Sequence, residues 1–102
     1  MKTFFGGIFI EATKLKEAGI QYPIKVEYYK LKDENNKKYG IEIIKTEYKP
    51  KNTEIEKKEL KSLSKDKCKI ERMLELFKRN EVTPISAEEI IEDFLVNHLP
   101  NI

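Results

Sequence analysis

The residues best suited to nucleophilic chemistry in this chain are one cysteine, Cys68, and one histidine, His98. A hydrolase of the common type needs a serine, cysteine or threonine beside a base, and only His98 could be that base. Helical periodicity places His98 on the apolar side of a C-terminal helix, near Ile91 and Phe94, so we interpret it as a packing residue. One cysteine and one histidine are too few for a Cys/His zinc site, and the sequence has no glycine-rich phosphate loop. We therefore expect no enzymatic activity, no metal and no cofactor.

Cys68 has two interpretations. It lies on a helix expected from about Lys65 to Arg79, opposite the apolar stripe, so the thiol should be exposed. The flanking Lys67 and Lys69 and the nearby helix N-terminus favour a thiolate, which is typical of a redox-sensitive or modifiable cysteine. The alternative, which we favour, is an incidental surface cysteine. A single unpaired cysteine also excludes an internal disulfide framework and fits a cytoplasmic protein.

The charged residues are distributed unevenly along the chain. The segment 57–80 has nine basic and four acidic residues, a net charge of +5, whereas 81–102 has five acids and no lysine or arginine. The net charge of the whole chain is only +2 because these two regions cancel. The charges are either two solvated faces or a polarised surface that orients a protein partner. On the second interpretation, we predict a partner-binding surface made of acids from the last helix and bases from the helix before it: Glu88, Glu89, Glu92, Asp93, Lys69, Arg72 and Arg79.

These side chains must be positioned by one small domain, because 102 residues do not suffice for two independent cores. Alternating apolar residues predict a strand over 23–31, an asparagine-rich turn and a second strand over about 38–48. In the second strand Ile44 and Tyr48 fall out of phase, so either both faces are covered or a bulge at Ile43–Ile44 switches the face. Both options favour a central strand. A third strand over 53–61 is dominated by lysine and glutamate, which is typical of an exposed edge.

Two helices are expected after these strands. The spacing of Ile70, Met73, Leu74 and Phe77 predicts the first helix, with Ser64 as its N-cap. The second has a capping box that begins at Ser86, with Ile85 packed on Ile90 as a hydrophobic staple. Its apolar stripe is Ala87, Ile90, Ile91, Phe94 and Leu95.

The N-terminal segment is ambiguous. Residues 3–10 suit a strand or an adherent arm, and 11–18 a short helix ended by Gly19. The apolar run is eight residues long, contains two glycines and stops at Glu11 without a cleavage site, so we do not interpret it as a secretory signal. No stretch approaches the ~20 apolar residues of a membrane helix, so we expect no membrane contact. We predict an N-terminal arm over 1–21 and one α+β domain over 22–102, with a three-stranded antiparallel sheet followed by two helices (βββαα).

Three segments resemble a known family: 28–31 (Tyr-Tyr-Lys-Leu), 39–43 (Tyr-Gly-Ile-Glu-Ile) and 79–85 (Arg-Asn-Glu-Val-Thr-Pro-Ile). The family consists of small uncharacterised proteins of anaerobic Gram-positive bacteria, classed as a domain of unknown function. The resemblance covers about residues 24–98 and leaves out the first twenty, which look peculiar to this chain. Where the family leads us to expect histidine after the Pro-Ile step, this chain has Ser86. The resemblance implies the βββαα order and an intracellular bacterial setting, and it supplies no activity or catalytic residue.

Two classes of function follow. We expect a non-enzymatic regulator or adaptor that acts through contact with a protein partner. The alternative is a nucleic-acid-binding regulator, because a lysine-rich strand before two helices is similar to the layout of a ribbon-helix-helix dimer. Alternating glutamates on that strand, and two upstream strands that would occupy its edges, oppose this alternative. A homodimer is also open, if the edge of the third strand and the outer face that bears Tyr29 and Tyr48 are uncovered.

Overall fold

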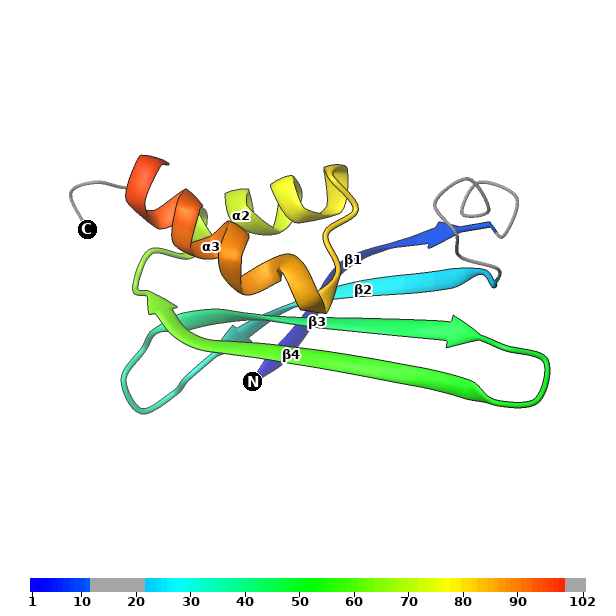
Figure 1. Ribbon diagram of the computed structural model, residues 1–102. Coiled ribbons are helices and arrows are strands. Elements are labelled where there is room, and N and C mark those ends of the chain that lie inside the picture. Colours follow the sequence, from blue (N-terminus) through cyan, green and yellow to red (C-terminus); the bar gives the residue numbers. More distant parts are fainter. Residues whose placement is uncertain (12–21, 99–102) are drawn as a thin grey trace.

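The computed structural model describes residues 1–11 and 22–98, with side chains through Glu92 (Figure 1). It is an α+β fold in which an antiparallel sheet of order β1-β2-β3-β4 has both helices on one face. The expected α+β class is confirmed, but the sheet has four strands instead of three. The additional strand is Lys2–Ile10, which pairs with the sheet. The short helix expected over 11–18 lies, apart from Glu11, outside the described residues. The elements are β1 (Lys2–Ile10), β2 (Ile24–Lys32), β3 (Tyr39–Tyr48), β4 (Thr53–Ser64), α2 (Lys67–Arg79) and α3 (Pro84–His98).

The helix-covered face of the sheet holds the core. Ile24, Val26 and Tyr28 of β2 are buried there, as their alternation predicts. The Tyr28 hydroxyl donates a hydrogen bond of 2.7 Å to the carbonyl oxygen of Val82, which lies between the two helices. This buried bond fixes the helix connection to the centre of the sheet.

β3 is the central strand that the sequence predicts, but the expected bulge at Ile43–Ile44 is absent. Its pairing with β2 and with β4 runs without a shift through both residues. Ile43 is therefore buried in the core, while Ile44 is half-buried on the opposite face, between the side chains of the neighbouring strands. Both sides of β3 carry apolar side chains because it lies in the middle of the sheet.

β4 is the charged edge strand that the sequence predicts, and it bends near its end. Ile41 pairs with Leu60 and Tyr39 with Ser64, so three residues of β4 lie opposite the single residue Gly40. A side chain at Gly40 would collide with the backbone carbonyl of Leu60, so only glycine permits this close approach. The bulge directs β4 toward α2 (Figure 1).

The first helix buries the predicted stripe, but it begins later than expected. Asp66 is the N-cap, and its carboxylate accepts hydrogen bonds from the backbone N–H of Cys68 (2.9 Å) and of Lys69 (3.4 Å). Ser64 is therefore wrong as the cap, because it still pairs in β4; its hydroxyl accepts from the backbone N–H of Asp66 instead. The buried residues are Ile70, Met73, Leu74 and Phe77.

The second helix begins at Pro84, so the expected capping box at Ser86 is wrong. Proline suits the first helical position because its fixed φ is helical and its missing N–H has no intrahelical acceptor there. Ser86 lies inside the first turn, where its hydroxyl donates to the carbonyl of Thr83. Ile85 is 80% exposed and forms no staple. Ala87 and Ile91 are buried as expected, whereas the side chains of Phe94 and Leu95 lie outside the described part.

Candidate functional site

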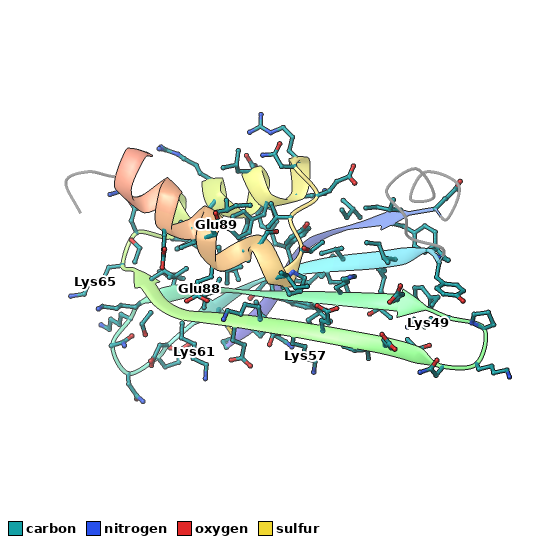
Figure 2. All side chains as sticks on the ribbon, in the orientation of Figure 1. Lys49, Lys57, Lys61, Lys65, Glu88 and Glu89 are labelled. Carbon is teal, nitrogen blue, oxygen red and sulfur yellow. The ribbon has the colours of Figure 1, made fainter. Side chains whose placement is uncertain are left out.

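The acidic residues of α3 have separate environments. Glu88 forms an ion pair with Lys58 of β4, at 3.0 Å between Oε2 and Nζ, and Glu89 and Glu92 are exposed. Figure 2 shows Glu88 on the side of α3 that faces β4. The side chain of Asp93 lies outside the described residues. One member of this acidic set thus contacts the sheet, and the others that are described face solvent.

The basic residues of α2 are also mostly at the surface. Arg72 and Arg79 are exposed and Lys69 is half-buried. Within the described side chains, no ion pair joins these three bases to the acids of α3. The seven-residue charged surface therefore stays a prediction, located on the helical layer of the molecule.

The residues considered for nucleophilic chemistry do not form a catalytic group in the part that the structure describes. Cys68 is exposed in the first turn of α2, as expected. The side chain of His98 lies outside the described residues. Among those described, no three His, Cys, Asp or Glu side chains converge as metal ligands. No helix among the described residues is long and apolar enough to cross a membrane.

The face of the sheet opposite the helices, called the open face below, carries exposed apolar side chains. Phe4 and Phe9 of β1, Ile55 of β4 and Tyr48 of β3 are 57%, 59%, 58% and 38% exposed. The Phe9 ring lies 6.3 Å from that of Tyr48, and the Phe4 ring lies edge-on to that of Tyr29 at 5.5 Å. Exposed apolar groups gathered on one face are typical of a contact surface.

From the sequence, Tyr29 and Tyr48 are expected on an outer face, but Phe4, Phe9 and Ile55 are not, because each strand supplies only one or two of these residues. The strand register places them on the same face: Phe9 pairs with Lys25, Lys25 with Thr46, and Thr46 with Ile55, so Phe9 and Ile55 lie in one row across the sheet. The sequence feature that could have indicated this surface is Ile55, an apolar residue within a strand of lysines and glutamates. Tyr29 and Tyr48 were placed on this outer face from the sequence, and the structure confirms both on it.

The charged groups of the open face largely neutralise one another. Lys25 pairs with Glu27 at 3.5 Å. Lys61 pairs with Glu59 at 3.4 Å, and Figure 2 shows both Lys57 and Lys61 directed away from the helices. This face therefore presents apolar groups among balanced charges.

The least exposed of these charges is Glu42. It is 5% exposed and accepts a hydrogen bond of 2.9 Å from the ammonium of Lys2, which also lies 4.6 Å from the centre of the Tyr29 ring. The hydrogen bond to Glu42 is the main cause that raises the pKa of Lys2 above its ordinary value. The pair fastens the start of β1 to the middle of the open face.

A hollow of about 410 Å³ lies at the end of the open face, where the bulge of β4 and the bare backbone of Gly40 leave space. Ser62, in the bulge, has a left-handed φ of 56° and accepts a hydrogen bond from the side-chain amide of Asn36. The lining mixes lysines with acids and includes Ser62 but neither histidine nor cysteine. It consists of Met1, Lys2, Leu31, Lys32, Asp33, Lys38, Gly40, Glu42, Glu59, Lys61 and Ser62.

Comparison with known proteins places the chain in a family. Residues 7–97 match the model of a family of unknown function, DUF6514. The match begins inside β1, so the expectation that the family resemblance leaves out the first twenty residues is wrong. The comparisons with curated proteins and with solved structures gave no match. From the match over most of its length, the chain belongs to the family of unknown function DUF6514.

Proposed function

We propose that this chain is a small, non-enzymatic protein-binding module, a regulator or adaptor, that contacts its partner through the open face. The observation that carries the proposal is the group of exposed apolar side chains on a face whose lysines are mostly paired with acids. The single unpaired cysteine supports a cytoplasmic location for this activity.

The chemistry of the open face favours a protein over a nucleic acid. Phosphate binding depends on lysine and arginine side chains that are free to replace counterions. On the open face Lys2, Lys25 and Lys61 each have a carboxylate partner instead. Aromatic and branched apolar groups with few free charges are the composition of a protein interface at its centre. The partner that fits is a protein surface with an apolar centre, such as one side of an amphipathic helix.

The charged surface on the helices is the alternative docking region. Its acids (Glu88, Glu89, Glu92 and Asp93) and its bases (Lys69, Arg72 and Arg79) belong to the helical layer, behind the open face. A partner held by long-range electrostatic attraction would choose this region and would dissociate in high salt.

The proposal is tested by affinity capture with the full chain expressed in its native host. Ile55→Lys places a charge at the β4 side of the apolar group, and Ile85→Lys makes the same change at an isoleucine on α3 that is more exposed still, at 80% against 58%. We expect the captured protein to fall at least tenfold with Ile55→Lys, equivalent to about 1.4 kcal/mol of binding, and to be retained with Ile85→Lys.

Two outcomes would contradict the proposal. One is equal capture by both variants, which would place the contact elsewhere. The other is co-purification of nucleic acid, sensitive to salt, in place of a protein.

A further inference from the structure

The two edges of the sheet differ in how their side chains protect them from pairing. β4 has six charged residues between Glu54 and Lys61, whereas β1 has neither a charge nor a proline between Lys2 and Glu11. Within the described ranges, no strand pairs with the outer side of β1. Free edges in proteins are usually protected by charges, prolines or a covering element. The bare edge of β1 therefore indicates a place for another strand.

The sequence of β1 is complementary to itself in the antiparallel direction. If two copies pair around the Gly6–Gly7 peptide bond, Lys2 lies opposite the partner's Glu11. Phe4 then lies opposite the partner's Phe9. The two-fold symmetry repeats both contacts, so the assembly has two ion pairs and two aromatic pairs.

The pleat of β1 agrees with this register. Phe4 and Phe9 both lie on the open face, while Phe5 and Ile8, which would also pair, are both half-buried against the core. The bulge between Phe4 and Gly6 shifts the alternation of side chains by one residue. The pair whose two members then belong to opposite faces is Gly6–Gly7, which has no side chains, so the paired side chains keep to the same face.

We propose that two copies of this chain join through their β1 strands into one continuous antiparallel sheet. The bulge narrows the choice of partner strand, because a strand without a matching shift would bring side chains of opposite faces together. Lys2 keeps its bond to Glu42, and its side chain, 48% exposed, leaves room for a second carboxylate beside it. Glu11 is exposed at the other end of the strand. The assembly would unite two open faces, but it does not depend on the proposed function.

Sedimentation velocity of the full chain at concentrations from about 5 to 500 μM tests the proposal, because this range covers the dissociation constants of weak protein dimers. We expect the mass to rise to twice that of the 12.1 kDa chain. Lys2→Glu and Glu11→Lys should each weaken the dimer about tenfold, because each puts like charges together at two places. An equimolar mixture of the two variants should recover the wild-type affinity, because opposite charges then meet at both places. Lys51→Glu, in the exposed β3–β4 turn, is the matched control and should have no effect.

Several outcomes would overturn the proposal. They are a wild-type chain that stays monomeric over this range, a dimer that neither variant weakens, and a mixture that recovers nothing. Lys2→Glu also loses its pair with Glu42, so its folding is checked by circular dichroism. If that variant is unfolded, the dimer affinity of Glu11→Lys is compared with that of Lys51→Glu instead. Equal affinities of the two variants would refute pairing through β1.

Discussion

At the residue scale, the hydroxyl of Tyr28 is the polar group that joins the two layers of the molecule. Its hydrogen bond to the Val82 carbonyl is buried, and burial raises the pKa of the tyrosine above its ordinary value. We expect Tyr28→Phe to lower the free energy of unfolding by about 1–2 kcal/mol, because the buried carbonyl loses its donor. Tyr29→Phe, one residue along on the open face, should cost little. Urea unfolding measures both, and equal losses would contradict this role of Tyr28.

The same side chain predicts a loss of stability in alkali. Because the pKa of Tyr28 is higher in the folded protein, its contribution is complete below pH 10 and is lost as the pH rises above 10.0, the ordinary value of the group. The difference in stability between wild type and Tyr28→Phe should therefore shrink above pH 10. Parallel unfolding curves from pH 8 to 11 would show that the tyrosine does not titrate in this way.

Gly40 is required by close approach of the backbone. A methyl group there meets the carbonyl of Leu60, so we expect Gly40→Ala to cost about 2 kcal/mol or more and to disturb the bulge of β4. Gly6→Ala is the control: its new methyl group would meet only the flexible side chain of Lys78, at 3.2 Å, which can move away. Thermal unfolding compares the two variants, and similar midpoints would disprove the steric explanation.

At the element scale, the start of α2 distinguishes between two candidate N-caps, Asp66 in the structure and Ser64 from the sequence. Asp66→Ala should destabilise the protein by about 1 kcal/mol, because two backbone N–H groups lose their acceptor. Adding 1 M salt should preserve most of that difference, since the hydrogen bonds are short-ranged. Chemical unfolding of the variant measures the loss, and an unchanged midpoint would contradict the cap.

Most elements could be predicted from the sequence where periodicity is regular. The alternation of Ile24, Val26 and Tyr28 and the stripe on α2 both indicate which side is buried, because hydrophobic spacing follows backbone geometry directly. The bulges could not be predicted in this way. They depend on contacts between strands: the bulge of β4 accompanies its extension from the expected end at Lys61 to Ser64, and the bulge of β1 changes the alternation after Phe4.

The helix starts show a related failure of local signals. The capping box at Ser86 predicts a start that is too late, because Pro84 itself suits the first helical position and Ile85 stays at the surface instead of packing on Ile90. The apolar group of the open face, beyond its two tyrosines, could not be predicted for the same physical reason. Phe9, Tyr48 and Ile55 are far apart along the chain, and the register of three strand pairings brings them together.

At the scale of the whole molecule, the sheet has one covered face, one open face, one charged edge and one uncharged edge. The covered face supplies stability through the core, while the open face and the β1 edge are the surfaces to which we assign contact with other molecules. The basic segment 57–80 and the acidic segment 81–102 meet where Lys58 of β4 pairs with Glu88 of α3, so part of the opposite charge that cancels along the chain also cancels in space. Under our proposal, partner binding by this protein therefore depends first on apolar contact and second on charge.

The most direct measurement is the dissociation constant of the captured partner for three forms of the chain, by titration calorimetry. They are wild type, Ile55→Lys, and a variant in which Glu88, Glu89, Glu92 and Asp93 are all changed to lysine. If the open face is the binding surface, Ile55→Lys raises the dissociation constant at least tenfold. The quadruple variant, verified as folded, keeps a dissociation constant within about twofold of wild type. The reverse order of effects would contradict the account and assign binding to the charged helices.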